Sequence, residues 1–157
     1  MRAREIANER CSIARPASLL GDRWTIMVLR QCFLGYRRFE DFQATLDCSR
    51  SVLADRLRQL VDEGVLTRVS YKDTARTRHE YRLTDKGMDL YPVLMALRTW
   101  GDRYMAPEGP PVAYRHHDCG GAAVVSHHCD RCGEELTARD VDARETPARS
   151  RRASPAA

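Results

Sequence analysis

Apolar residues recur at helical spacing through the first part of the chain and predict three helices. The first covers residues 12–20. The second begins after Asp22, a residue type that caps helix N-termini, and continues to about Phe33. The third is short and covers residues 38–45. The order of elements is therefore entirely helical up to this point.

The most regular helical pattern lies in residues 49–63. Leu53, Leu57 and Leu60 share one face of the helix, and Ser49 stands at the position of an N-cap. A turn that contains Asp47 separates this helix from the preceding one. Two helices joined by a short turn are typical of a helix-turn-helix.

After this helix the pattern changes to the alternation expected of strands. Residues 65–71 and 80–83 alternate apolar and polar side chains, and the polar stretch 72–79 joins them into a predicted hairpin. Residues 84–104 then predict a long last helix, in which Pro92 should cause a kink because proline has no N–H to donate.

The order of these elements predicts a mainly α fold with a small β-hairpin wing, that is, a winged helix-turn-helix followed by a small zinc-bound unit. The expected divisions are an N-terminal arm at 1–10, the winged helix at 11–106, a linker at 107–113, the zinc-ribbon-like unit at 114–140 and a disordered tail at 141–157. No internal repeat is visible.

Composition favours a cytoplasmic protein without a membrane partner. No apolar run reaches the roughly 20 residues of a membrane helix, and the charged N-terminus is unlike a secretion signal. The six cysteines should therefore be free or bound to metal. Through Glu108 there are 19 Lys and Arg against 15 Asp and Glu, and beyond it 7 against 7, so the whole net charge of +4 lies in the first part. This mild excess suits a polyanionic partner without establishing one.

The N-terminus of helix 49–63 is the candidate DNA-contacting element. With its leucines turned inward, Ser51, Asp55 and Arg58 point outward, and an arginine at the first turn, Arg50, can bond guanine O6 and N7. Asp55 could accept from a cytosine amine, but we favour a role in orienting Arg58. The full candidate set is Ser49, Arg50, Ser51, Val52, Asp55, Arg56 and Arg58 on the helix, with Arg76 and Arg78 at the hairpin tip, in a wing of residues 71–80. Taken singly, each of these features also suits an ordinary solvated helix or turn.

Several motifs carry a resemblance to a known family. They are Cys-Ser-Ile-Ala-Arg at 11–15, Leu-Gly-Asp-Arg-Trp-Thr at 20–25, Arg-Phe-Glu-Asp-Phe at 38–42, Val-Leu-Ala-Asp-Arg-Leu at 52–57 and Tyr-Arg-Leu-Thr-Asp-Lys-Gly at 81–87. Together they resemble the HxlR-type transcriptional regulators of the wider MarR-like group, over residues 11–106. The resemblance implies a homodimer whose terminal helices pair, with helix 49–63 on a double-stranded DNA operator. The chain departs from the family's frequent Pro-Pro-Arg at the wing, where it has residues 74–78, and from a common glycine at Asp47.

The resemblance also implies a candidate sensor of oxidants or electrophiles at Cys11. A thiolate at the start of a helix, near Arg10 and Arg15, is expected to have a lowered pKa. The alternative is a small buried cysteine at the dimer seam. Cys32 and Cys48 are interpreted as structural residues without a chemical role. Cys48 lies in the turn of the helix-turn-helix, and if it is exposed, its modification could affect DNA binding.

Beyond the linker, the spacing His-x2-Cys-x9-Cys-x2-Cys predicts a structural Zn2+ site. His116, Cys119, Cys129 and Cys132 supply the four N and S ligands of a closed tetrahedral site, and a glycine follows each pair. The alternatives are a redox pair at Cys129 and Cys132, or a different fourth ligand. The candidates for that ligand are His117, His127 and His128.

Two function classes remain open from the sequence, and an enzyme is not expected, because no catalytic constellation or phosphate loop is evident. The first is a DNA-binding regulator. The second is a zinc-ribbon module that binds protein or RNA on a winged-helix dimerisation scaffold. Deleting residues 110–157 would distinguish them. Retained operator binding would support the DNA-binding regulator, whereas loss of activity with intact DNA binding would support the zinc-ribbon module.

Overall fold

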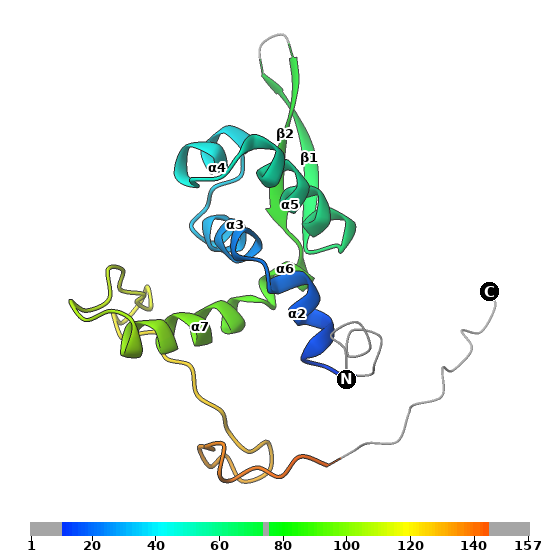
Figure 1. The fold of residues 1–157 in the computed structure, drawn as a ribbon. Helices are drawn as coiled ribbons and strands as arrows, with labels where there is room; N and C mark the ends of the chain where they lie inside the picture. The colour runs from blue at the N-terminus through cyan, green and yellow to red at the C-terminus, as the bar shows by residue number, and fades with distance from the viewer. Residues whose placement is uncertain (1–10, 74–75, 145–157) are drawn as a thin grey trace, which may run out of the picture. The chain divides into compact units, whose positions relative to one another are not determined.

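The structure is a computed structural model that describes residues 11–73 and 76–144 (Figure 1). The chain divides into two compact units between Ala113 and Tyr114. The predicted N-terminal arm at 1–10 and most of the predicted tail, from residue 145 onward, lie outside the described residues.

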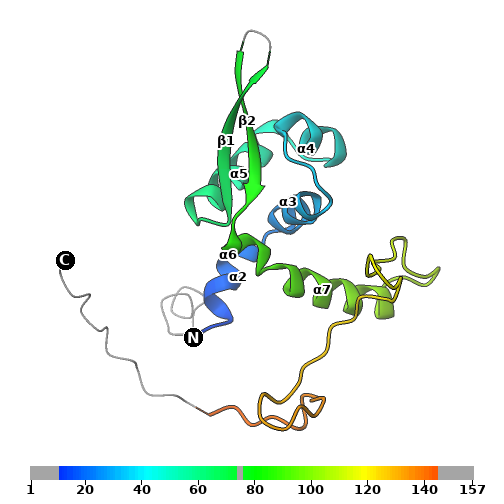
Figure 2. The ribbon, with the colours of Figure 1, turned by 180° about the vertical axis from the view of Figure 1, so that it is seen from behind.

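The first unit is a winged helix-turn-helix, as the sequence predicts. Its elements are α2 (Ala14–Leu20), α3 (Arg23–Phe33), α4 (Phe39–Thr45), α5 (Arg50–Asp62), β1 (Leu66–Asp73), β2 (Arg76–Leu83), α6 (Asp85–Met88) and α7 (Tyr91–Tyr104). The two strands form one antiparallel hairpin, which projects past α4 and α5 (Figures 1 and 2).

Two predicted N-caps are confirmed. The Asp22 carboxylate accepts hydrogen bonds from the backbone N–H groups of Trp24 and Thr25, at 3.0 and 3.1 Å. Ser49 Oγ accepts from the N–H of Val52 at 3.3 Å. Such caps satisfy donors that a helix leaves unpaired and each stabilise it by about 1 kcal/mol. They fix where α3 and α5 begin.

The core of the unit holds α5 in place. Val28 and Leu29 of α3, Phe42 of α4, and Leu53, Leu57 and Leu60 of α5 have no exposed surface. The three leucines are those that the sequence assigns to the inward face. Because this face is fully used in packing, the orientation of α5 about its own axis is fixed and its opposite face remains in solvent.

The hairpin is longer than the sequence predicts. The ladder continues from the pair Leu66 and Leu83 to the pair Asp73 and Arg76, so most of the polar stretch 72–79 belongs to strands. Hydrophobic alternation could not show this, since a two-stranded ribbon beyond the core is solvated on both faces. The segment before α4 also touches the ribbon: the N–H of Tyr81 donates to the carbonyl of Arg37 at 2.7 Å.

The predicted single helix at 84–104 is wrong. It is two helices, α6 and α7, and Pro92 lies in the first turn of α7 instead of kinking a helix interior. Proline is suited to this turn because the N–H it lacks would have no helical partner there. The break follows a close approach at Gly87, where an added Cβ would stand 2.3 Å from the Val65 carbonyl oxygen.

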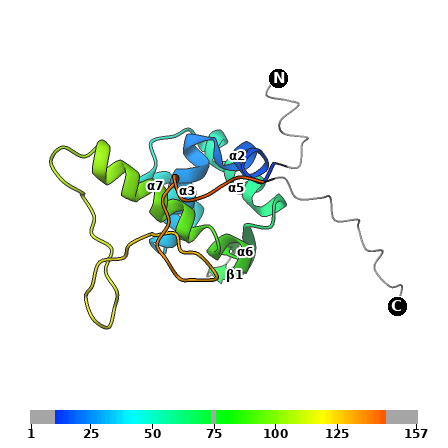
Figure 3. The ribbon, with the colours of Figure 1, turned by 90° about the horizontal axis from the view of Figure 1, so that it is seen from below.

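The last helix, α7, runs outward from the cluster formed by α2, α3 and α5 (Figures 1 and 3). Near its start Tyr91 packs on Phe33 of α3, with ring centroids 5.2 Å apart. Within the described parts of the chain, none of the helices combines the length and apolarity needed to cross a bilayer.

Candidate nucleic-acid interface

The first turn of α5 is open to solvent. Ser49, Arg50 and Ser51 are exposed, and the two serine hydroxyls lie 3.1 Å apart. The guanidinium of Arg50 lies 4.7 Å from the ring centre of Phe39, on the neighbouring helix α4. This cation–π contact holds the arginine beside the helix start without burying it. The turn thus offers hydroxyls, backbone N–H groups and one cation together.

The turn that precedes α5 is itself braced. The side-chain amide of Gln43 donates to the carbonyl of Cys48 at 3.0 Å, and the N–H of Cys48 donates to the carbonyl of Leu46 at 2.9 Å. A fixed turn sets the angle between α4 and α5, and therefore the direction in which the N-terminus of α5 points.

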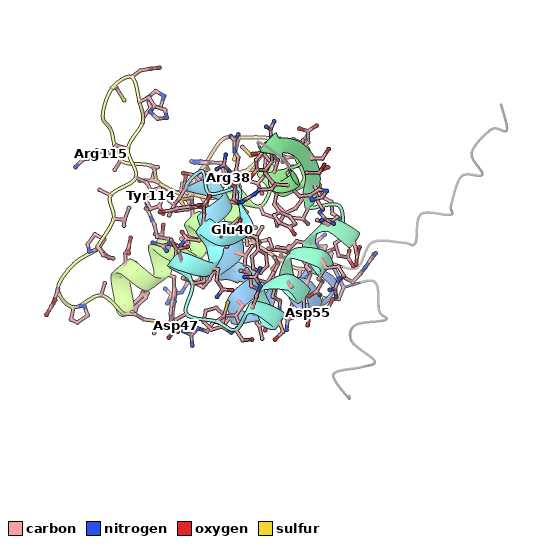
Figure 4. All side chains as sticks on the ribbon, turned by 90° about the horizontal axis from the view of Figure 1, so that it is seen from above. Arg38, Glu40, Asp47, Asp55, Tyr114 and Arg115 are labelled. Atoms are coloured by element: carbon pink, nitrogen blue, oxygen red, sulfur yellow. The ribbon has the colours of Figure 1, made fainter. Side chains whose placement is uncertain are left out.

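One turn further along α5, Asp55 and Arg58 form a pair. Arg58 Nη1 donates to Asp55 Oδ1 at 2.9 Å, and both side chains are largely exposed. This is the contact expected if Asp55 orients Arg58. Seen from above, Asp55 lies on α5 and Glu40 on α4 (Figure 4).

Arg56 and Val52 are less available than the other candidates on α5. Arg56 Nε lies 3.0 Å from Asp22 Oδ1, and its Nη1 donates to Gln59 Oε1 at 3.0 Å. Its guanidinium therefore joins α5 to the capped start of α3. Val52 is half-buried. Both residues are less exposed than Arg50 and Arg58, and their role in DNA binding stays a prediction.

Further cations that the sequence pattern does not single out lie on the wing and beside it, at the start of α4. Arg38 lies 5.0 Å from the ring centre of Tyr71, and Arg68 Nη2 lies 3.0 Å from His79 Nδ1 (Figure 4 labels Arg38). Arg78 Nη1 is 3.8 Å from Glu40 Oε1. The side chain of Arg76 lies outside the described residues. Arg38 and Arg68 come from separate elements, so only the fold brings them to the same ribbon.

An apolar stripe remains exposed on α7. Leu94 and Met95 face the core, whereas Val93, Leu97, Trp100 and Tyr104 are between 48% and 62% exposed. The four exposed residues are spaced by three or four positions, which places them on one face of the helix. A contiguous exposed apolar stripe of this kind is typical of a protein–protein interface.

The cysteines of the first unit lie in different environments. Cys11 Sγ accepts a hydrogen bond from the N–H of Ala14 at 3.3 Å, at the start of α2. Burial raises the pKa of Cys32 to about 12. Partial burial, followed by the nearby Asp47 carboxylate, raises the pKa of Cys48. Cys32 and Cys48 are therefore poor sources of thiolate at neutral pH.

In the second unit the predicted metal ligands form two separate pairs. His116 Nδ1 lies 3.3 Å from Cys119 Sγ. Backbone N–H groups of Cys132 and Arg131, and then the Cys132 thiol, lower the pKa of Cys129. Within residues 11–73 and 76–144, the structure does not gather three or more potential ligands into one group. The described residues therefore do not show the predicted zinc site, and Zn2+ binding stays a prediction.

Comparison with known proteins gives consistent similarities. The HxlR-like helix-turn-helix family matches residues 19–109. An uncharacterised HTH-type transcriptional regulator of Mycobacterium tuberculosis, Rv3095, is 47% identical over 131 residues, which cover 83% of this chain and 82% of that protein. The crystal structure of PA1607, a candidate transcription factor, has a TM-score of 0.79 at 35% identity and covers 90% of this chain and 99% of its own. The reduced form of the transcriptional regulator YodB from Bacillus subtilis has a TM-score of 0.54 at 30% identity, covering 63% and 98%.

Proposed function

Since the chain belongs to the HxlR-like helix-turn-helix family of transcriptional regulators and is not an enzyme, we propose that it is a homodimer that binds a specific DNA operator through α5. The operator is double-stranded, and each subunit places the N-terminus of α5 in the major groove. The wing lies along the backbone or the minor groove of the same duplex.

The observation that carries this proposal is the asymmetry of α5. Its three leucines have no exposed surface, whereas Arg50, Ser51 and Arg58 stand on the exposed side. A helix held this way can enter a major groove without disturbing the core. Arg50 is placed to bond a guanine edge, which discriminates against the wrong base by about 1–3 kcal/mol. Ser49 and the first N–H groups suit a phosphate oxygen.

The wing contributes affinity more than specificity. Arg78 and Arg76 stand on β2, Arg68 stands on β1, and Arg38 lies beside the ribbon at the start of α4. Arginines along a ribbon neutralise phosphates, and each one neutralised makes binding more sensitive to salt. We therefore assign sequence selection to α5 and most of the salt dependence to the wing.

The exposed stripe of α7 is the proposed dimer contact. The rings of Trp100 and Tyr104 are already in contact within the chain, tilted and with centroids 5.5 Å apart, and both residues remain more than half exposed. Pairing two copies of this stripe about a two-fold axis would remove it from water. The same axis would present two copies of α5 to successive half-sites of an operator.

The experiment that tests the α5 assignment is a gel-shift titration with the Arg50→Ala variant. We expect an affinity loss of roughly 5- to 150-fold for the selected operator, corresponding to about 1–3 kcal/mol, and a weaker preference at one base position. The matched control is Arg139→Ala, which removes an exposed arginine of the second unit. Equal affinity of wild type and Arg50→Ala for every duplex would exclude this role for α5.

We further propose that Cys11 makes operator binding sensitive to oxidants or electrophiles. Its sulfur accepts a backbone N–H at the start of α2, and the reduced form of YodB is among the similar structures. The test is operator binding by wild type and Cys11→Ser before and after treatment with peroxide or a quinone. Wild type should change its affinity and the variant should not. The same change in both proteins would eliminate the proposal.

A further inference from the structure

The second unit contains two copies of one backbone turn, placed 13 positions apart. Each copy begins at a predicted metal ligand, His116 or Cys129. The backbone N–H of this residue donates to the carbonyl five positions later, and its carbonyl accepts from the N–H four positions later. The bonds are His116 N–H to Gly121 O (2.8 Å) and Gly120 N–H to His116 O (2.9 Å), then Cys129 N–H to Glu134 O (2.9 Å) and Gly133 N–H to Cys129 O (2.9 Å). The structural repeat corrects the sequence expectation that no repeat is present.

The repeat extends to the flanks of each turn. Ala123 N–H donates to Tyr114 O at 3.0 Å, and Leu136 N–H donates to His127 O at 2.7 Å (Figure 4 labels Tyr114 and Arg115 in the first copy). Isolated bridges pair Arg115 with Ala122 and His128 with Glu135. The glycine after each second ligand has a positive φ, 69° at Gly120 and 75° at Gly133. Since other residues rarely adopt this φ, the glycines are what allow both turns to close.

In the first turn, the distance between the two ligand atoms is close to the distance expected in a metal chelate. His116 Nδ1 and Cys119 Sγ are 3.3 Å apart. Tetrahedral bonds of about 2.1 Å to nitrogen and about 2.3 Å to sulfur would place these two atoms about 3.6 Å apart. In the second turn the side chains of Cys129 and Cys132 interact through a hydrogen bond. Each half of a four-ligand site is thus formed by its own turn.

The repeat also decides which histidine is the fourth ligand. Thirteen positions before Cys129 stands His116, whereas His127 corresponds to Tyr114 and His117 to Asp130. His128 corresponds to Arg115, and both of these bond the carbonyl of the turn glycine: Arg115 Nη1 to Gly120 O at 2.9 Å, and His128 Nδ1 to Gly133 O at 3.2 Å. Arg115 and His128 therefore brace their turns and are not ligands.

Within its described residues, 114–144, the second unit has no apolar core to hold the two turns together. Between residues 114 and 144 no side chain is buried, and Val124 is 80% exposed. A small unit without a core needs another source of folding free energy, and a structural metal supplies it in proteins of this size.

We propose that His116, Cys119, Cys129 and Cys132 bind one Zn2+ within each chain and fold residues 114–140 around it. The site takes one imidazole nitrogen and three thiolates, so binding Zn2+ displaces three protons from the cysteines to solvent and forms no other bond. Four protein ligands leave no open position, which makes the site structural. This proposal is independent of the DNA-binding function of the first unit.

The test is the zinc content of the full-length protein, purified without chelator and measured by mass spectrometry. We expect roughly one zinc per chain, and a visible Co2+ spectrum of tetrahedral thiolate type after exchange. Cys119→Ser, Cys132→Ser and His116→Ala should each lower the metal affinity by at least about tenfold, since even residues that only brace a ligand cost this much. His117→Ala is the matched control and should keep the metal.

Several results would overturn the proposal. One is a wild-type protein that holds no zinc and gives no Co2+ spectrum, and another is zinc that stays at the wild-type level in Cys119→Ser and Cys132→Ser. A disulfide between Cys129 and Cys132 in the purified protein, or zinc bound only between two chains, would also overturn it. Operator binding by the same variants shows that their first unit remains folded. A failure of the metal site is thereby distinguished from a failure of the regulator.

Discussion

Two arginines of α5, only two positions apart, make different contacts. Arg56 forms an ion pair with Asp22 at the start of α3, at 3.0 Å, and Arg58 pairs with its own helix neighbour Asp55 at 2.9 Å. The first contact joins two elements and the second leaves its cation at the surface. Residue type alone therefore does not assign a DNA contact, because the direction of each side chain depends on what the helix packs against.

Burial makes Cys32 chemically inert, and this can be measured. Its pKa is raised to about 12, so we expect alkylation at about pH 8 to be roughly 1000-fold slower in the folded than in the unfolded protein. Because the pKa of Cys32 is higher in the folded than in the unfolded protein, its contribution to the free energy of unfolding is complete below the unfolded pKa and disappears as pH rises toward 12. The measurement is iodoacetamide labelling followed by peptide mass spectrometry, with and without urea. Equal labelling rates in the two conditions would contradict the assigned burial.

Among the elements, those with one buried face could be predicted from the sequence. The pattern of α5 is explicit because Leu53, Leu57 and Leu60 all enter the core. The hydrophobic pattern does not predict the strand residues beyond 71, because both faces of the hairpin are solvated there and no alternation of apolar and polar residues is present. The pattern also does not predict the break between α6 and α7, near which Gly87 approaches the Val65 carbonyl, a contact between distant positions.

The close approach at Gly87 gives a prediction for stability. Gly87→Ala places a Cβ 2.3 Å from a backbone oxygen, so we expect it to destabilise the first unit by about 1–3 kcal/mol in spite of the better helix propensity of alanine. The measurement is urea unfolding followed by tryptophan fluorescence. The exposed neighbour Asp89→Ala serves as control and should change little. A Gly87→Ala protein as stable as wild type would show that α6 does not pack as described.

The two units should also respond separately to a chelator. If Zn2+ folds the second unit, removing it should unfold residues beyond about 112 and leave the helices of the first unit intact. Hydrogen exchange before and after chelation reports both units in one experiment. Unchanged protection of the backbone N–H groups at Gly120 and Gly133 would contradict the metal dependence, because these bonds close the two turns.

At the scale of the whole molecule, the proposed binding to two half-sites of an operator requires a dimer. Leu97 is 53% exposed at the centre of the α7 stripe, so Leu97→Glu would place a charge in the proposed seam. We expect this variant to be monomeric by light scattering and to lose at least about tenfold in operator affinity, since one half-site contact is lost. Thr99→Glu is the control and should remain dimeric, because Thr99 is exposed on α7 but is not three or four positions from any residue of the stripe. A dimeric Leu97→Glu protein would place the subunit contact elsewhere.

The whole account depends on α5 selecting a DNA sequence. The most direct measurement is selection of bound duplexes from a random pool by the full-length protein at low ionic strength. The account predicts a motif with two related half-sites about one helical turn apart, whose binding weakens steeply as salt rises. Recovery of duplexes with no common sequence would contradict it.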